Sequence, residues 1–419
     1  METKKFACFE ISTDTIKLLI GYCLGEKPCV LYAETRPLPE GLLERGVIKN
    51  EGALVEEFKK FTFFENEALK LRTTLHEICL VLPPVGLKIY LTNKLTSASS
   101  GDKRITRVDV ANVIQQARND TLPSGGEVVD IIPTVFELSN GEKYANPPLG
   151  KESNFLSASL FIHSLPKASS TDFVRLANLS GFRVRKSSIA PYCQALLFAQ
   201  DKTLPSTYLL LDIGSRYTAL SLIGEHQPYR SHSFTLGGHD LSDFIASKFG
   251  ISFAEAENIK KIYGYSERKS SYNPPLGKGI KEGSLLEEGF SQIDLNKAIE
   301  EFFDGYLNQL QAAFRALDDG KSGDLTHIDV VLTGGGSRLL GLDHFLSLSW
   351  PSHSLHRPSE AYVGANAKEY AACLGMLLAA SHYSGTLEDN YHGVAQVSRA
   401  SGKKEKKTER KNSAQEDSL

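Results

Sequence analysis

The stretch LLLDIGSRYTALSLIG, Leu209 to Gly224, is similar to CFEISTDTIKLLIG, Cys8 to Gly21. When Asp212 is aligned with Glu10, an apolar run meets an acidic residue in both stretches, and a turn of small polar residues and a second apolar run follow. The offset is 202 residues (212 − 10), whereas solenoid repeats have periods of roughly 20–50 residues. The repeat therefore predicts two domains built on one plan, each opening with the same hairpin.

Length and composition indicate a globular protein of several domains. The chain has 419 residues, 41% of them hydrophobic and 23% charged, and domains run roughly 100–200 residues. The net charge of −3 provides no basic field for nucleic acid. The six cysteines form no CxxC pair, so we expect buried free thiols and no zinc site. No signal peptide or membrane span is apparent, and YAACLGMLLAA (Tyr370 to Ala380) reads as a buried helix, so we expect a cytoplasmic protein.

Periodicity and turn residues divide the chain into segments. Residues 85–165 read as a strand–helix–strand–strand module, whose helix is capped by Thr106 and Asp109. This module is inserted into a first domain formed by residues 1–84 and 166–204. A second domain comprises residues 205–250 and 326–383, and 251–325 form a smaller subdomain with a capping box at Ser252 and Glu255. The lysine-rich end, residues 384–419, predicts a disordered charged tail.

The two hairpin turns could hold a polyphosphate between them. A phosphate needs several backbone N–H groups aimed at one point, and small residues let the backbone approach. Glu10 and Asp212, at the mouths of the turns, could hold a hydrated Mg²⁺, because this ion prefers carboxylate oxygens and retained waters. Arg216 of the second turn could grip a phosphate directly or point into solvent.

Two later elements could contact the rest of a nucleotide. A glycine turn, Gly334 to Gly336, leads into a helix and could pass close to a base or sugar. Glu257, Lys260 and Lys261 share one helical face and could bond a ribose and flank an adenine. Each element alone has a simpler structural explanation, as a hairpin, a flexible turn or a solvated helix face. The order of all four elements, together with the repeat, favours a nucleotide cleft.

That order resembles the superfamily of actin, heat-shock ATPases and sugar kinases, and within it the FtsA family of bacterial cell-division proteins. The resemblance rests on RGVIKNEGAL, on ITRVDVANVIQQAR followed by IIPTVFELSNGEKYANPPLG, on SFTLGGHDLSDFIASKFGISFAEAENIKKIYG and on VVLTGGGSRLLGL. It implies an α/β, actin-like two-domain ATPase fold with duplicated ribonuclease-H-like domains and an inserted small α+β subdomain. The nucleotide-binding residues that it implies are Glu10, Ser12, Thr13, Asp212, Gly214, Ser215, Arg216, Tyr217, Thr218, Gly238, Glu257, Lys260, Lys261, Gly334, Gly335, Gly336 and Ser337.

The resemblance also implies a role. Such a protein binds ATP with Mg²⁺, assembles into filaments at the septum and links the tail of the tubulin-like protein FtsZ to the inner face of the cytoplasmic membrane. Other division proteins would bind through the inserted subdomain. The amphipathic membrane helix with which the family usually ends is not evident here, so membrane contact through the tail would be weak or indirect.

The sequence departs from the family pattern at both turns. The second turn in the family looks like D-I-G-G-G-T-T-D, whereas this chain has DIGSRYTA. The first turn in the family looks like D-I-G-T-S-K, whereas this chain has EISTDT. Asp14 adds a carboxylate that would repel a phosphate, and Lys17 comes two places late. Ala190-Pro191 stands where relatives carry Glu-Pro. Gln194 could substitute for that glutamate or lie on the helix surface. We therefore expect nucleotide binding with slow or absent hydrolysis.

Three other functions are compatible with such a chain. A pilus-assembly adaptor of the PilM type shares the actin-like core and an inserted module. A small-molecule kinase would need a catalytic aspartate near a substrate pocket, and we find no candidate beyond Asp212. A scaffold that has lost nucleotide binding would explain the substituted turns.

Overall fold

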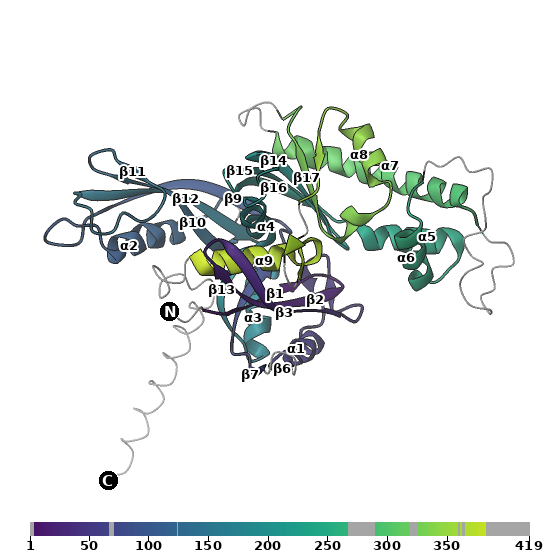
Figure 1. Cartoon of the computed structure of the whole chain (residues 1–419), viewed down its shortest axis with the longest axis horizontal. Helices are drawn as coiled ribbons and strands as arrows, with labels where there is room; N and C mark the ends of the chain where they lie inside the picture. The colour runs from purple at the N-terminus through teal and green to yellow at the C-terminus, as the bar shows by residue number, and fades with distance from the viewer. Residues whose placement is uncertain are drawn as a thin grey trace, which may run out of the picture.

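The computed structural model describes residues 4–66, 71–123, 125–266, 290–318, 325–358, 361–362 and 365–382. Among them are two five-stranded sheets and one four-stranded sheet. Figure 1 shows the four-stranded sheet at one end of the molecule and helices α5 to α8 at the other, with helices α4 and α9 between them. The protein thus has the mixed α/β architecture that the sequence predicts.

The first five-stranded sheet has the order β13-β8-β1-β2-β3. Its strands are β1 (Phe6–Ile11), β2 (Thr15–Leu24), β3 (Lys27–Pro37), β8 (Glu77–Leu82) and β13 (Arg183–Ile189). Strands β1 to β3 form an antiparallel meander, and β8 lies parallel to β1. The helices of this half are α1 (Glu51–Lys59), α3 (Thr171–Leu179) and α4 (Ala190–Phe198).

The second five-stranded sheet repeats this plan in the order β16-β15-β14-β17-β18. Its strands are β14 (Thr207–Ile213), β15 (Thr218–Gly224), β16 (Gln227–Phe234), β17 (Val330–Thr333) and β18 (Leu355–His356). Glu10 pairs with Lys17 across the first hairpin, and Asp212 pairs with Ala219 across the second. Both pairs are offset by 202 residues (212 − 10 and 219 − 17). The predicted duplication is therefore confirmed, pair for pair.

The inserted module has a sheet and a core of its own. Its sheet has the order β11-β10-β12-β9, with β9 (Lys88–Ser97), β10 (Glu127–Leu138), β11 (Lys143–Tyr144) and β12 (Phe155–Leu165). Helix α2 (Arg107–Arg118) begins with the predicted capping box of Thr106 and Asp109. The buried side chains of α2 pack on those of β10 and β12 to form this core.

The remaining helices surround the second sheet. They are α5 (Gly238–Phe249), α6 (Phe253–Ile262), α7 (Gln292–Leu317) and α8 (Leu342–Ser349). Helix α6 has the predicted capping box of Ser252 and Glu255, and α5 ends at Gly250 in the left-handed conformation.

The described residues also form three two-stranded sheets. They pair β4 (Leu43–Glu44) with β5 (Val47–Ile48), β6 (Phe63–Asn66) with β7 (Leu71–Thr74), and β19 (Ala361–Tyr362) with β20 (Ala365–Asn366).

Helix α9 (Ala367–His382) joins the two halves. It packs on α4 and on β1 and β2 of the first sheet, and Figure 1 shows it beside α4 at the centre of the molecule. The same hydrophobic core includes Tyr208 and Leu210 of β14 and Val331 of β17. The apolar run from Tyr370 to Ala380 is thus a buried helix, as predicted. The two halves therefore share one hydrophobic core.

Three further expectations concern the cysteines, membrane-spanning helices and the charged tail. All six cysteines are free, and four of them (Cys8, Cys79, Cys193 and Cys373) are buried. Within the described ranges, no helix is both long enough and apolar enough to cross a membrane. The predicted disordered tail, residues 384–419, lies outside the described residues.

Candidate functional site

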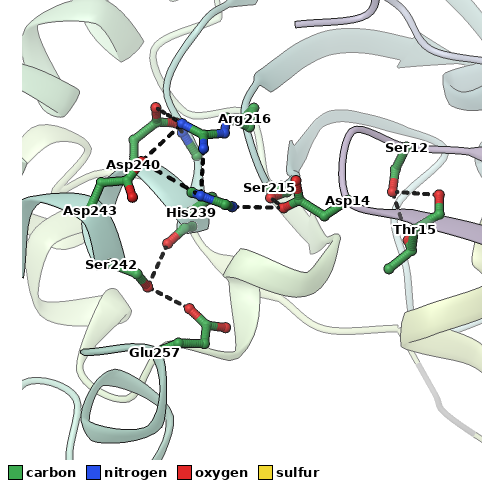
Figure 2. A network of polar contacts seen from close by, with 12 residues as sticks. Ser12, Asp14, Thr15, Ser215, Arg216, His239, Asp240, Ser242, Asp243 and Glu257 are labelled. Atoms are coloured by element: carbon green, nitrogen blue, oxygen red, sulfur yellow. Dashed lines mark hydrogen bonds and ion pairs between the residues drawn. The ribbon is translucent and has the colours of Figure 1, made fainter. Parts of the chain in front are cut away.

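The two hairpin turns face one another. In the first, the backbone N–H of Ser12 donates to the Thr15 carbonyl over 2.9 Å, which closes a tight turn. In the second, the N–H of Gly214 donates to the Tyr217 carbonyl, also over 2.9 Å. The side chains of the first turn contact those of the second (Figure 2). The repeat thus brings two equivalent turns to one point between the halves.

A cavity of about 770 Å³ lies between the two halves, within the 300–1,000 Å³ typical of small-molecule sites. Both turns, α6 and the glycine turn after β17 contribute to its wall. The sequence-predicted residues that line it are Glu10, Ser12, Asp212, Gly214, Ser215, Tyr217, Gly238, Glu257, Lys260, Lys261, Gly334, Gly335 and Gly336. The structure therefore gathers residues from four distant segments around one cavity.

Asp212 lies deep in this cavity and is only 7% exposed. Its Oδ2 accepts a hydrogen bond from Nε2 of Gln194 over 3.0 Å. Burial raises the pKa of Asp212 to about 6, and the nearby charge of Glu10 adds to this rise. Gln194 is itself 4% exposed, so its interpretation as a surface amide is wrong. The Gln194 amide instead points from α4 into the cavity, toward the acidic residue of the second hairpin.

Glu10 forms an ion pair with Lys17, whose Nζ lies 3.2 Å from Glu10 Oε1. Burial alone would lower the pKa of Lys17, but the charge and the hydrogen bond of Glu10, together with other nearby acidic groups such as Asp212, raise it. Lys17 lines the cavity even though it comes two places later than the lysine of the family pattern. The strand register places it directly opposite Glu10. Lys17 thus brings a positive charge to the wall of the cavity.

The oxygen atoms around Asp212 suit a cation that keeps most of its water ligands, rather than a cation bound only by protein side chains. Oε2 of Glu10 and Oε1 of Gln194 are buried and accept no hydrogen bond from any described residue. The described ranges hold no group of three His, Cys, Asp or Glu side chains that could bind a metal. Mg²⁺ commonly keeps several waters and binds through one or two carboxylates plus phosphate. The residues present fit that mode, with Lys17 held on the other oxygen of Glu10.

The charged face of α6 borders the same cavity. Lys260 and Lys261 donate to opposite oxygens of Glu257 over 2.5 and 2.9 Å, and Ser242 donates to Glu257 as well. Burial opposes ionisation of Glu257, but these donors lower its pKa to about 2. Nζ of Lys260 also donates to the Gly238 carbonyl over 2.6 Å. The predicted face is therefore an ordered, ionised network rather than a solvated surface.

The glycine turn after β17 approaches the second hairpin closely. Gly334 has φ of +83°, and a Cβ there would collide with Asp212 and Ile213. A Cβ on Gly336 would collide with the Ile213 side chain. By contrast, a Cβ on Gly335 would have no neighbour within 4 Å. Two glycines are thus required by packing, whereas Gly335 leaves open space in the cavity.

Four predicted residues do not line the cavity: Thr13, Arg216, Thr218 and Ser337. The Arg216 guanidinium turns toward α5 instead, where it lies 2.9 Å from Asp243 and 3.6 Å from Asp240. It therefore neither faces the cleft nor points freely into solvent. The Thr218 hydroxyl donates to the Leu236 carbonyl over 2.8 Å. The hydroxyl of Ser337 donates to the Gly334 carbonyl, also over 2.8 Å.

Several lining residues were not anticipated as site residues. His239 follows Gly237 and Gly238 and stacks on Phe253 with ring centroids 4.2 Å apart. Helix α7 adds the rings of Phe302, Phe303 and Tyr306 to the wall. The helical spacing of these three rings indicates only that they face inward. Periodicity cannot separate a core position from a cavity wall, because both are apolar and inward-facing.

Comparison with known proteins finds similarity to one family of proteins. A family model described as "Cell division protein FtsA" matches residues 209–375. The cell division protein FtsA of Enterococcus faecalis is 22% identical over 399 residues, which cover 93% of this chain and 86% of the relative. That of Bacillus subtilis is 21% identical over 385 residues, which cover 89% and 82%. This chain is similar to FtsA over most of its length.

Other matches are partial, or extend to the fold alone. The alignment with FtsA of Agrobacterium fabrum, 22% identical, covers 59% of this chain and only 55% of that relative. A solved PilM–PilN type IV pilus biogenesis complex matches with a TM-score of 0.58 and 19% identity, over 90% of this chain and 98% of that chain. MreB5 of Spiroplasma citri bound to ADP matches with a TM-score of 0.53 and 14% identity, over 93% and 99%. These structures show that the fold of this FtsA-like chain is actin-like, as predicted.

Proposed function

We propose that this chain is an actin-like, ATP-binding cell-division protein that assembles at the septum and links the FtsZ ring to the inner face of the cytoplasmic membrane. The observation that carries the proposal is the cavity of about 770 Å³, walled by both hairpin turns and by the glycine turn. The relatives of this chain are cell-division proteins, which supports the cell-division role. The proposal includes self-association of the chain, binding of the FtsZ tail and contact with the membrane.

In the proposed complex the polyphosphate lies between the two turns and the nucleoside lies near Gly334–Gly336 and α6. Backbone groups at the turns, which carry no large side chain at Ser12 and Gly214, would approach the phosphates. Glu10 and Asp212 would hold a hydrated Mg²⁺, which neutralises phosphate charge when bound.

Hydrolysis in this cleft would be slow. Ala190 stands where relatives carry a glutamate and offers no proton acceptor, and the amide of Gln194, in the same helix, cannot take a proton from water. Its Nε2 already donates to Asp212 over 3.0 Å. Rapid release of phosphate from ATP by the purified protein would contradict this part of the proposal.

No observation specifically favours the alternative of a pilus-assembly adaptor. The PilM–PilN complex matches with 19% identity, and a likeness at that level extends to the fold alone. If the cavity bound no nucleotide, the alternative of a scaffold that has lost nucleotide binding would be favoured.

The test is calorimetric titration of ATP and of ADP, with Mg²⁺, into wild type, Gly335→Asp and Gly335→Asn. Because a Cβ at Gly335 would have open space around it, both variants should fold. We expect nucleotide binding by wild type and by Gly335→Asn, and at least about a tenfold loss in Gly335→Asp, because a carboxylate in the cavity repels phosphate.

The asparagine variant is the matched control, since it has nearly the same shape as the aspartate variant without its charge. Equal affinity of the two variants would argue against a polyphosphate between the hairpin turns, because the glycine turn adjoins the second of them at Asp212. No binding of ATP or ADP to wild type would overturn the nucleotide-binding proposal and favour a scaffold.

A further inference from the structure

Asp14 at the tip of the first turn reaches across to the second turn. Its Oδ2 accepts hydrogen bonds from the Ser215 hydroxyl and from Nδ1 of His239, the latter over 3.0 Å. Figure 2 shows the Asp14 carboxylate between these two side chains. This contact joins residues 201 positions apart in the sequence. It is therefore a direct tie across the mouth of the two turns.

The partners of Asp14 are themselves held firmly in place. His239 is 8% exposed, stacks on Phe253 and has Arg216 on its Nε2. The neutral tautomer with its proton on Nδ1 satisfies both sides, since Nε2 then accepts from Arg216 and Nδ1 donates to Asp14. Arg216 is fixed in turn by Asp240 and Asp243. The His239 ring that faces Asp14 is thus pre-oriented by α5 and α6.

A hydroxyl and a ring N–H at the tip of a phosphate turn are donors that a terminal phosphate group would use. In this structure a carboxylate of the same protein uses them. A carboxylate is smaller than a phosphate but carries the same sign of charge, so the two groups exclude each other from one position. Arg216 does not offset the Asp14 charge in the cavity, because its guanidinium points toward α5 (Figure 2).

We propose that Asp14 fills the position of the terminal phosphate of a nucleoside triphosphate, so that the cleft binds a nucleoside diphosphate more tightly than the triphosphate. This inference rests on the proposed nucleotide-binding function. A diphosphate leaves the tie between Asp14, Ser215 and His239 intact. A triphosphate has to break both hydrogen bonds and then lies beside the displaced carboxylate.

The test compares the dissociation constants of ADP and ATP, with Mg²⁺, for wild type, Asp14→Ser and Asp14→Asn. We expect wild type to prefer ADP. Asp14→Ser removes the charge and shortens the side chain, so the ratio of the ATP constant to the ADP constant should fall at least about tenfold, or about 1.4 kcal/mol. Asp14→Asn removes only the charge and should give a smaller fall. Glu56→Gln removes one charge from the exposed face of α1 and should leave the ratio unchanged.

The outcomes separate this inference from the function on which it rests. A wild type that prefers ATP, or a ratio that Asp14→Ser leaves unchanged while both nucleotides bind, would overturn the role of Asp14 and leave the nucleotide cleft standing. Failure of both nucleotides to bind any of the proteins would overturn both proposals. If circular dichroism shows that Asp14→Ser is unfolded, Asp14→Asn, which keeps a hydrogen-bonding oxygen, provides the same comparison.

Discussion

Asp212 is a charged residue whose position costs stability. Burial raises its pKa from 3.8 to about 6, so the folded protein binds this proton more tightly than the unfolded chain. The resulting contribution to stability is complete below pH 3.8 and is lost as the pH rises through 6. At neutral pH the ionised carboxylate is therefore unfavourable, which is the pattern expected of a group retained for binding rather than for folding.

Replacing Asp212 by asparagine should stabilise the protein at pH 7.5. The pKa difference predicts a gain of about 3 kcal/mol there, which falls to roughly half at pH 5 because the carboxyl is then protonated in the folded state. Urea denaturation of wild type and Asp212→Asn at both pH values measures it. Gln194 can still donate to the new side-chain oxygen. A gain independent of pH, or a loss at pH 7.5, would contradict the raised pKa of Asp212.

At the residue scale the sequence predicted part of the site. The acidic residue at each hairpin turn located Glu10 and Asp212. Helical spacing located the charged face of α6. Arg216 and His239 could not be assigned, because the direction of their side chains depends on Asp240, Asp243 and Phe253, which approach only in the folded chain. Gln194 was ambiguous for a related reason. Whether a helical amide is exposed depends on what packs over it.

At the scale of secondary-structure elements, helices α4 and α9 cross at very close range. A Cβ on Gly375 of α9 would overlap the backbone of Cys193 in α4. Glycine is needed there for close approach rather than for a special backbone angle, since Gly375 is not among the glycines of positive φ.

Gly375→Ala should therefore destabilise the protein by at least about 2 kcal/mol, because the two helices have to separate and the shared core loosens. Gly305→Ala in α7 is the matched control. A Cβ at Gly305 would have no neighbour within 4 Å, so alanine should stabilise its helix by about 0.5–1 kcal/mol. Thermal unfolding of both variants measures the contrast. Equal effects of the two substitutions would show that the crossing is not close-packed.

Elements were easier to predict than their contacts. The hairpins, the capped helices α2 and α6 and the buried helix α9 all follow from periodicity, capping residues and the internal repeat. The partner of each element did not follow. Nothing in the Tyr370–Ala380 run indicates that it packs on the first sheet rather than on the second, because an apolar face does not specify which apolar face covers it.

For the whole molecule, the proposed role predicts which partner binds. A peptide of the FtsZ C-terminal tail should bind the full-length chain, and a peptide of the pilus protein PilN should not. Fluorescence anisotropy with both labelled peptides, each also tested as an unlabelled competitor, measures the difference. A preference for the PilN peptide would reverse the assignment, whereas the actin-like fold would be unaffected.

The position of α9 has a consequence for the biosynthesis of the protein. Cys373 of α9 contacts Cys8 of β1, although 365 residues separate them in the chain. At roughly 5–20 residues per second, the ribosome completes α9 on the order of half a minute after β1. Until then the face of the first sheet that α9 covers has no partner. The second sheet, whose strands and helices α5 to α8 are nearly contiguous, has its own cover earlier. The half of the protein that is translated first is therefore the half that can finish folding last.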